Sequence, residues 1–420
     1  MEAIDSMDEI RTEPSGYRWV VLFVFSIINA VMQIQWLTFA PVAREARLVY
    51  GVTALQIDLL SIIFMGVFII ICIPASYIID TFGIRIGVGL GAILIAVFGL
   101  LKGLYAHHYT MVVISQIGLA VAQPFILNSA TKVAGCWFPV EERATAVGIA
   151  TLAQFIGIIC AMIVTPLLVT QNSEGAYQLR NMLLTYGIIS VAGAILILAF
   201  LKEAPASTPD ATGPDKRINV FEGLKHILSL KDMRLMILLF FLGLGMFNAI
   251  STCIDQICQI KGLSTEQSGL VGGMMLIAGI IGAVILPVLS DKLRKRKMFI
   301  IIGMLFMTPG LIGLTVATGY ITLLVSSFVL GFFLLGSCAP IGFQFCAEVS
   351  FPAPESTSQG LILLAGQISG IIFIFGMNRI GMIPSMFIFI GFSIIGIIIS
   401  AMLKESPMIQ ADHGNAGTAR

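Results

Sequence analysis

Charged residues and histidine are scarce in this chain of 420 residues. Only 11% of the residues are Asp, Glu, Lys or Arg, and four are histidine (His107, His108, His226 and His413). A soluble domain carries about 25% charged residues, so the composition excludes an ordinary water-soluble fold. The seven cysteines form no C-x-x-C pair and have no histidine spacing suited to a metal. We therefore expect packing cysteines, no metal site and no cofactor.

The sequence also lacks the signatures of common catalytic and nucleotide sites. It contains no P-loop, so transport driven by ATP would need another chain. The four histidines lie outside the apolar runs and combine with no serine and acid into a catalytic set. The net charge of +1 gives no reason to expect nucleic acid as a partner. We expect that the protein is not an enzyme.

Long apolar runs are what the sequence does have. Hydrophobic residues make up 57% of the chain and the mean hydropathy is +0.98. Runs of about 20 residues are long enough to cross a bilayer core as helices. The pattern predicts an all-α membrane protein with twelve transmembrane helices, over residues 17–40, 54–79, 85–105, 109–135, 143–170, 180–202, 233–260, 266–289, 297–318, 320–348, 356–378 and 382–403.

Basic residues indicate the orientation. With both ends inside, six of the 24 Lys and Arg fall outside (Arg44, Arg47, Lys102, Arg180, Lys261 and Arg379), which leaves 18 inside. The positive-inside rule thus predicts cytoplasmic tails over residues 1–16 and 404–420. The acidic start followed by a run without a cleavage site predicts no removable signal peptide. We expect a multi-pass protein of a plasma membrane, of the bacterial inner-membrane type.

A repeat divides the chain. Phe138-Pro139, Glu142, Gln154 and Gly157 recur 213 residues later as Phe351-Pro352, Glu355, Gln367 and Gly370. The repeat predicts two pseudo-symmetric six-helix bundles, over residues 17–202 and 233–403. Residues 203–232 would join them, with a disordered composition first and then an interfacial helix that carries Val220, Phe221, Leu224, Ile227 and Leu228. A regulatory docking segment is the alternative reading of that helix.

A second repeat lies in two short loops. Asp80-Thr81-Phe82-Gly83-Ile84-Arg85 returns 211 residues later as Asp291-Lys292-Leu293-Arg294-Lys295-Arg296-Lys297. These loops resemble the loop signature of the major facilitator superfamily. The resemblance implies a gating role for Asp80, Arg85 and Asp291, in which the carboxylate caps a helix and pairs with Arg. Residues 292–297 also suit a positive-inside anchor, and both readings are compatible.

Polar residues within the spans indicate which helices line a pathway. Spans three, six, nine and twelve carry almost no Asn, Gln, Asp or Glu, so we expect them at the periphery of the bundle. By helical rise, Gln154 and its repeat mate Gln367 lie near the midplane, where transporter sites form. We predict that they bind substrate, together with Gln33, Trp36, Asn248 and Gln344. Hydrogen bonding between helices is the alternative for each amide.

Acidic residues in the spans lie away from the midplane. Asp58 and Asp255 fall near the outer ends, and Glu348 falls near the inner end. We expect them to form gate hydrogen bonds or ion pairs, with proton coupling as the alternative. Glu142 and Glu355 follow the repeated Phe-Pro pairs at the inner surface, where we expect the helices to hinge.

A closer family resemblance covers most of the chain. It rests on residues 342–352 and 366–373, on Asn29-Ala30 with Gln35, on Gly51 to Ser61, and on Trp137-Phe138. These segments resemble the feline leukaemia virus subgroup C receptor family, solute carriers described for haem and for choline and ethanolamine. Where the family's choline site has aromatics in spans one and seven, this chain has Gln33 and Asn248. The span-eleven glutamine is retained as Gln367, and the span-five glutamine is displaced by one residue, to Gln154.

The amide-rich site favours a neutral or zwitterionic solute. We expect a monomeric secondary transporter that moves a small polar organic solute by alternating access, as a uniporter or with H⁺ or Na⁺ as coupling ion. Choline-like or ethanolamine-like amines and vitamins are open as substrates. Transport of haem or another porphyrin is the alternative, although the spans supply no histidine ligand. A receptor or membrane enzyme that borrowed the fold is a third hypothesis.

Overall fold

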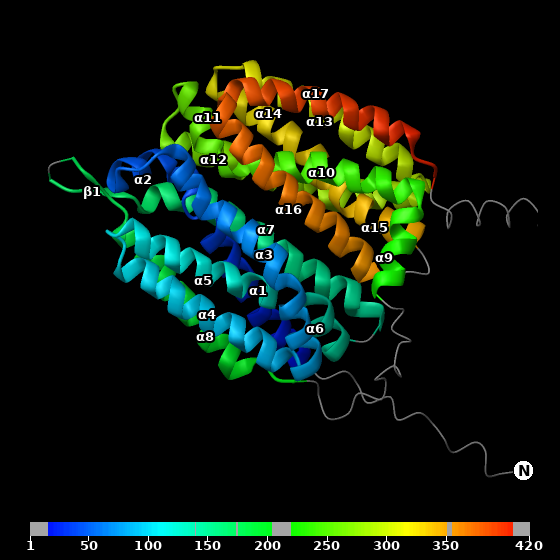
Figure 1. Ribbon diagram of the computed structural model, residues 1–420, viewed down its shortest axis with the longest axis horizontal. Coiled ribbons are helices and arrows are strands. Elements are labelled where there is room, and N and C mark those ends of the chain that lie inside the picture. Colours follow the sequence, from blue (N-terminus) through cyan, green and yellow to red (C-terminus); the bar gives the residue numbers. More distant parts are fainter. Residues whose placement is uncertain (1–15, 139, 174, 204–219, 351–354, 406–420) are drawn as a thin grey trace, which may run out of the picture.

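The structure is a computed structural model that describes residues 16–138, 140–173, 175–203, 220–350 and 355–405. Two groups of helices lie beside each other (Figure 1). Elements α1 to α8 form the first half, and α9 to α17 form the second. The chain enters at Tyr17 and leaves at Leu403 at the same end of the molecule, which we call the tail end. The opposite end, which carries α2 and α11, is called the distal end.

The first half contains all the strand structure found in the described residues. Its elements are α1 (Tyr17–Leu37), the 3-10 turn η1 (Ala40–Val42), α2 (Ala43–Tyr50), α3 (Ala54–Phe82), α4 (Ile84–Leu104), α5 (Tyr109–Leu127), α6 (Ala130–Trp137), α7 (Val140–Leu168), β1 (Thr170–Gln171), β2 (Tyr177–Gln178) and α8 (Arg180–Phe200). Strands β1 and β2 form a short antiparallel hairpin at the distal end.

The second half repeats the long helices of the first. Its elements are α9 (Val220–Ser229), α10 (Lys231–Thr252), α11 (Ile254–Ile260), α12 (Thr265–Leu293), α13 (Arg296–Val316), α14 (Tyr320–Phe333), the π-helical turn η2 (Leu334–Cys338), α15 (Ala339–Ser350), α16 (Glu355–Ile380) and α17 (Met382–Met402).

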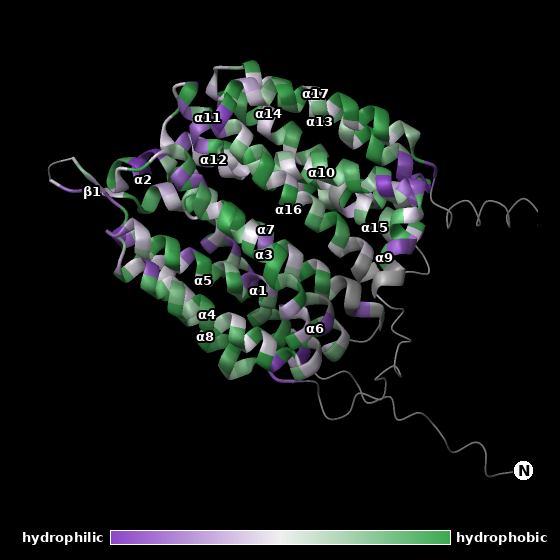
Figure 2. Cartoon of the chain, in the orientation of Figure 1, coloured by the Kyte–Doolittle hydropathy of each residue, from purple (hydrophilic) through white to green (hydrophobic). Residues whose placement is uncertain are grey.

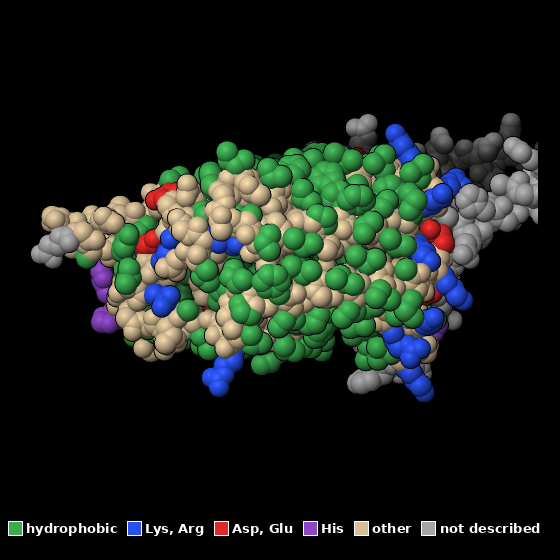
Figure 3. Space-filling model, turned by 90° about the horizontal axis from the view of Figure 1, so that it is seen from above, with side chains coloured by type: hydrophobic (Ala, Val, Ile, Leu, Met, Phe, Trp, Pro, Cys, Tyr) green, Lys and Arg blue, Asp and Glu red, His purple; other side chains and the backbone are tan. Residues whose placement is uncertain are grey.

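The predicted transmembrane architecture is confirmed. Within the described residues, 12 helical segments are long and apolar enough to cross a membrane. Hydrophobic residues cover the helix bodies, whereas hydrophilic residues gather at the distal and tail ends (Figure 2). From above, an apolar belt is flanked by basic side chains toward the ends (Figure 3). Such a belt is what a bilayer core requires of the surface it contacts.

Several helices are more broken than the hydropathy predicted. Span four divides into α5 and α6 at Asn128, one turn after Pro124. Asn128 donates from its side chain to Ser76 Oγ at 3.0 Å and to the Cys72 carbonyl oxygen at 3.3 Å, both in α3. Proline removes a helix hydrogen bond, and the asparagine side chain finds partners on another helix, so the break is stabilised by tertiary contacts. Spans seven and ten divide similarly, into α10 with α11 and α14 with α15.

Packing follows the polarity of the spans. Helix α4 packs along α8, and α13 packs along α17, so these helices form the two outer flanks (Figure 1). They are spans three, six, nine and twelve, as predicted. Helix α1 packs along α7, and α10 packs along α16. The halves meet mainly where α7 contacts α12 and where α3 contacts α16.

Each of the two repeated loops contains one residue with a positive φ. Gly83, between α3 and α4, has φ of 89°, and Arg294, between α12 and α13, has φ of 51°. The positions are 211 residues apart, the offset of the loop repeat. A left-handed turn costs a residue with a side chain about 1 kcal/mol relative to glycine. The second loop therefore has a positive φ at this position although arginine stands where the first loop has glycine.

The expected helix before span seven is present as α9. Ile227 is fully buried, and α9 contacts α10 and α16. Lys225 and His226 are exposed on its other side. The predicted disordered linker, residues 204–219, lies outside the described residues, as do the tails 1–15 and 406–420 and the Phe351-Pro352 pair.

Candidate functional site

Gln154 links α7 to two polar residues of α1. Its Oε1 accepts a hydrogen bond from Gln33 Nε2 at 3.4 Å, and its Nε2 donates to Asn29 Oδ1 at 3.3 Å. The two α1 residues are one turn apart, so they share a face of the helix. Gly157 brings the helices together, because a Cβ at this position would overlap the Ala30 carbonyl oxygen.

Two buried polar atoms beside Gln154 lack partners. Gln33 Oε1 and Trp36 Nε1 have no hydrogen-bond partner among the described residues, although these side chains are only 5% and 8% exposed. A buried polar atom without a partner costs about 1 to 3 kcal/mol. One acceptor and one donor on the same face of α1 are therefore available to a polar solute.

The second half has a matching helix pair. Asn248 of α10 is 3% exposed and donates from Nδ2 to the Gly366 carbonyl oxygen of α16 at 3.3 Å. A Cβ on Gly370, the repeat mate of Gly157, would lie 3.0 Å from both Asn248 Nδ2 and Met65 Sδ. The repeated glycines thus lie at close contacts in equivalent helix pairs, α1 with α7 and α10 with α16.

Gln367 lies between these contacts, one residue after Gly366. Its side chain is half-buried and has no hydrogen-bond partner in the described part of the chain. Its amide offers both a donor and an acceptor. The structure brings Gln33 and Gln154 together, Trp36 follows Gln33 on the same face of α1, and Asn248 and Gln367 lie on the equivalent helices. It does not join Gln344 to them, because Gln344 is exposed and donates to Glu348 Oε1 at 2.9 Å.

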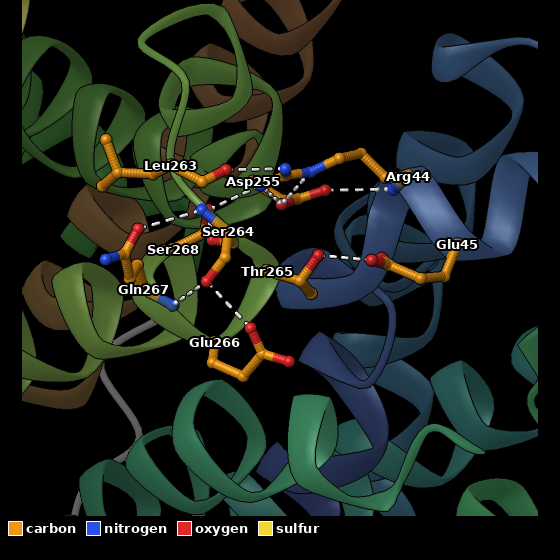
Figure 4. A network of polar contacts seen from close by, with 9 residues as sticks. All are labelled: Arg44, Glu45, Asp255, Leu263, Ser264, Thr265, Glu266, Gln267 and Ser268. Atoms are coloured by element: carbon orange, nitrogen blue, oxygen red, sulfur yellow. Dashed lines mark hydrogen bonds and ion pairs between the residues drawn. The ribbon is translucent and has the colours of Figure 1, made fainter. Parts of the chain in front are cut away.

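An ion pair joins the halves at the distal end (Figure 4). Arg44 of α2 donates to Asp255 of α11 from Nη2 at 2.6 Å and from Nε at 2.8 Å, and its backbone N–H donates to Oδ2 at 3.0 Å. Arg44 also donates to the Leu263 carbonyl oxygen and to Ser268 Oγ, both of the second half. Asp255 is fully buried. Hydrogen bonds between a charged donor and a charged acceptor are stronger than those between neutral groups. Sequence analysis predicted a gate role for Asp255 but did not identify Arg44.

Asp58 makes a second connection between the halves. It is 2% exposed and accepts hydrogen bonds from Gln256 Nε2 at 2.7 and 2.9 Å and from Asn378 Nδ2 at 2.6 Å. Cys253 Sγ contributes a longer contact of 3.6 Å. All the donors belong to the second half. Asp58 therefore forms hydrogen bonds, with Gln256 and Asn378 as partners that the sequence did not reveal, and its gate role stays a prediction.

At the tail end, the two ion pairs found between described residues each lie within a single half. Arg18 Nε lies 3.1 Å from Glu142 Oε2, joining α1 to α7. Arg296 Nη2 lies 3.2 Å from Glu348 Oε1, joining α13 to α15. Between described residues, the side-chain hydrogen bonds that cross from one half to the other all lie at the distal end. The molecule is thus closed by polar contacts at one end.

Two glutamates cap helices at the tail end. Glu203 accepts from the backbone N–H groups of Ile84 and Arg85 at 3.0 and 2.9 Å, and Glu405 accepts from that of Lys297 at 3.1 Å. They end the matching segments Leu201-Lys202-Glu203 and Leu403-Lys404-Glu405, a repeat that sequence analysis overlooked. The start of α4, just after the first repeated loop, is thus capped by Glu203, a role that the sequence did not reveal.

The gate role of four predicted residues stays a prediction. Arg85 is exposed, and its backbone N–H is bonded to Glu203. The side chains of Asp80, Asp291 and Glu355 lie outside the described part of the structure.

One charged residue is buried in a way that the sequence did not reveal. Lys102, which was counted with the outer charges, lies in α4 with a fully buried side chain. Its Nζ donates to Gln116 Oε1 at 3.2 Å and lies 3.4 Å from Thr38 Oγ1. The ammonium also lies 5.6 Å from the centre of the Phe39 ring. Lys102 thus ties the end of α1 to α4 and α5, just before η1 and α2.

The described residues contain no group of His, Cys, Asp and Glu arranged to hold a metal ion.

Comparison with known proteins identifies the family. The model of the Major Facilitator Superfamily matches residues 18–374. The chain belongs to the major facilitator superfamily. The match covers both halves. It includes the helices through which the halves contact each other and those that carry the glutamine pairs: α1, α3, α7, α10, α12 and most of α16.

Relatives within this superfamily are transporters. The choline/ethanolamine transporter FLVCR1 of Felis catus is 28% identical, over 88% of this chain and 69% of its own length. Solute carrier family 49 member A3 of Xenopus tropicalis is 28% identical, over 85% of this chain and 76% of its own. An uncharacterised MFS-type transporter of Caenorhabditis elegans is 27% identical, over 98% and 73%. The resemblance noted in the sequence is thus confirmed.

Solved structures share the fold. A bacterial homologue of the human lysosomal transporter Spinster superposes with a TM-score of 0.75 at 15% identity, covering 92% of this chain and 96% of its own. The D-xylose-proton symporter superposes with a TM-score of 0.70 at 15% identity, covering 94% and 99%. The chain is therefore a multi-pass membrane transporter of the major facilitator superfamily.

Proposed function

We propose that this transporter moves a small polar organic solute by alternating access, with Gln154 and Gln367 as equivalent ligands of the solute in the two halves. The observation that carries the proposal is the pair of repeated helix contacts, in which polar atoms of Gln33, Trp36 and Gln367 are left without partners in the described residues. Amide groups without a partner in the protein can hydrogen-bond a solute, and they favour a molecule with hydroxyl, amine or amide groups.

Closure at one end supports alternating access. Arg44–Asp255 and the Asp58 contacts hold the distal end shut, whereas Arg18–Glu142 and Arg296–Glu348 lie within single halves. Rocking of the halves would break the first set and leave the second intact, as expected for rigid bundles that move about a central site. The positive-inside pattern favours a cytoplasmic tail end in a plasma membrane, so this conformation would be closed to the outside. We propose a monomer as the transporting unit.

Small amines are the preferred substrate class. The curated relatives named above include a choline/ethanolamine transporter, and one indole and several amides suit an ammonium group that also carries a hydroxyl. Ethanolamine fits this site better than choline, because its N–H groups can donate to amide oxygens such as Gln33 Oε1. The porphyrin alternative has less support, since the three described histidines, His107, His108 and His226, are exposed outside the spans.

Uptake by proteoliposomes tests the proposal. Radiolabelled ethanolamine, choline and a panel of vitamins are offered to vesicles with the purified full chain and to empty vesicles. We expect saturable uptake of at least one small polar solute, with ethanolamine preferred to choline. Imposed H⁺ and Na⁺ gradients then show whether either ion is coupled. Haemin uptake with no uptake of any small solute would instead favour the porphyrin alternative.

A further inference from the structure

A cavity lies between the halves at the closed distal end. Its volume is about 840 Å³, and its walls come from α2, the end of α7 and the β1–β2 hairpin in the first half, and from α11 and the start of α12 in the second. Gln33, Trp36, Gln154 and Gln367 are not among its lining residues. We call it the distal cavity. It is therefore separate from the glutamine site, on the far side of the Arg44–Asp255 closure.

Glu45 presents an unpaired carboxylate oxygen in this wall. Its side chain is buried, with 5% of the residue exposed. Oε1 accepts a hydrogen bond from Thr265 Oγ1 of the second half (Figure 4), whereas Oε2 has no partner among the described residues. A buried carboxylate needs a cation or several donors to offset the loss of hydration. One lone pair set of Glu45 is thus available to a cationic ligand.

The charges that line the cavity favour a cation. The charge of Arg44 is balanced by Asp255. The remaining charged side chains of the lining are one positive, Arg47, and two negative, Glu45 and Glu266. Arg47 Nε is buried without a partner in the described chain, so it is available to a hydroxyl or an anionic group. Tyr177 adds an aromatic ring to the wall, which favours an ammonium. The set matches a small ammonium compound with a hydroxyl or acidic group at its other end.

We propose that the distal cavity is a second binding site, which takes a small organic ammonium compound through Glu45 and Glu266. The inference deepens the proposed function, on which it rests for the class of solute. An ammonium bound at Glu45 competes with Thr265 for the carboxylate. Because the Thr265 hydrogen bond joins the two halves, the ligand weakens the closure and shifts the population toward a distally open state. The cavity thus receives the solute before the glutamine site is exposed.

Binding stoichiometry of the purified full-length protein tests this site without transport. Equilibrium dialysis with radiolabelled ethanolamine is expected to reveal two sites per chain. Glu45→Gln removes the charge with little change in size, and we expect it to weaken the distal site at least about tenfold. Thr265→Val is the matched control, because it deletes the same hydrogen bond between the halves but keeps the carboxylate. Because the bound ammonium competes with Thr265 for the Glu45 carboxylate, this variant should keep or raise the affinity of the distal site, whereas Glu45→Gln lowers it.

Two further variants make the result decisive. Glu266→Gln changes an exposed residue and should weaken the distal site even if Glu45→Gln destabilises the protein. The double variant Gln154→Ala/Gln367→Ala should lose only the other site. A single ethanolamine site, or two sites whose affinities are unaffected by both Glu45→Gln and Glu266→Gln, would overturn the inference. If proteoliposomes transport no amine but binding sensitive to Glu45→Gln persists, the proposed function fails and the distal site stands.

Discussion

Arg44 and Asp255 lie 211 residues apart in the chain and form an ion pair between the two halves, in which Nη2 and Nε of Arg44 both donate to Asp255 Oδ1, at 2.6 and 2.8 Å. Residues so distant in sequence meet because α2 of the first half and α11 of the second both lie at the distal end. Their contact contains a fully buried carboxylate. Opening this end requires that the pair separate, so its strength sets the population of the closed state.

Asp255→Asn should open the distal end more often. The substitution leaves the Arg44 guanidinium without its charged partner, and loss of one member of a buried pair costs about 3 kcal/mol, which is an increase of about a hundredfold in the open population. Cys253 and Cys258 are fully buried beside this closure and report on it. In a chain that retains Cys253 alone among the seven cysteines, thiol labelling should be slow with the ion pair intact and much faster after Asp255→Asn.

The exchanged pair is the control for that experiment. Arg44→Asp combined with Asp255→Arg restores opposite charges and should return Cys253 labelling at least partly toward the original rate. Equal labelling of Cys253 before and after the Asp255→Asn substitution would show that the ion pair does not hold the distal end closed.

Gly157→Ala should damage function more than Gly370→Ala. A methyl group at residue 157 would meet the Ala30 backbone carbonyl, which cannot move without shifting α1, whereas at residue 370 it would meet the Asn248 side chain and Met65 Sδ at 3.0 Å. Overpacking of this kind costs about 1 to 3 kcal/mol and separates the helices. Uptake rate and thermal unfolding in detergent measure the two effects.

Matched alanine substitutions are available in the same helices. A Cβ on Gly148 of α7 or on Gly376 of α16 would meet nothing within 4 Å. Alanine at these positions should leave uptake unchanged and raise stability slightly, because it favours the helix. If Gly157→Ala behaves like Gly148→Ala, the close approach of α1 and α7 does not position Gln154.

Glu203→Ala and Glu405→Ala should each destabilise the tail end. Each removes a carboxylate that accepts from backbone N–H groups at the start of α4 or α13, and a lost cap costs about 1 kcal/mol. The melting temperature should fall by a few degrees for each variant, whereas Lys225→Ala at an exposed position of α9 should have no effect. An unchanged melting temperature in both glutamate variants would contradict the capping role.

The number of spans, the flanking helices and the repeat of a glutamine with a glycine could be predicted from the sequence. Apolar length fixes where helices cross a bilayer, and Gln154 with Gly157 recurs as Gln367 with Gly370. These features are local or repeated in the sequence, so they can be recognised without knowledge of the fold.

The partners across the halves could not be predicted. Asn378 meets Asp58 over a separation of 320 residues, and nothing near either residue in the sequence indicates the other. The burial of Lys102 could not be predicted either, because its partners Gln116 and Thr38 come from two other helices. The repeated Leu-Lys-Glu segments could have drawn attention to Glu203 and Glu405. Their capping role could not be predicted, because helix capping by a distant residue leaves no periodic pattern in the sequence.

Solute uptake by the glutamine variants tests the central claim most directly. Proteoliposomes with the unaltered chain, Gln154→Ala, Gln367→Ala, the double variant, and Gln178→Ala on the exposed β2 strand as control are compared for uptake of the solute that the panel identifies. We predict that each single variant lowers uptake at low solute concentration about tenfold, since one amide hydrogen bond to a solute contributes about 1 kcal/mol or more. The double variant should abolish saturable uptake, and Gln178→Ala should leave it unchanged. Unaltered uptake in the double variant would contradict a solute site at Gln154 and Gln367.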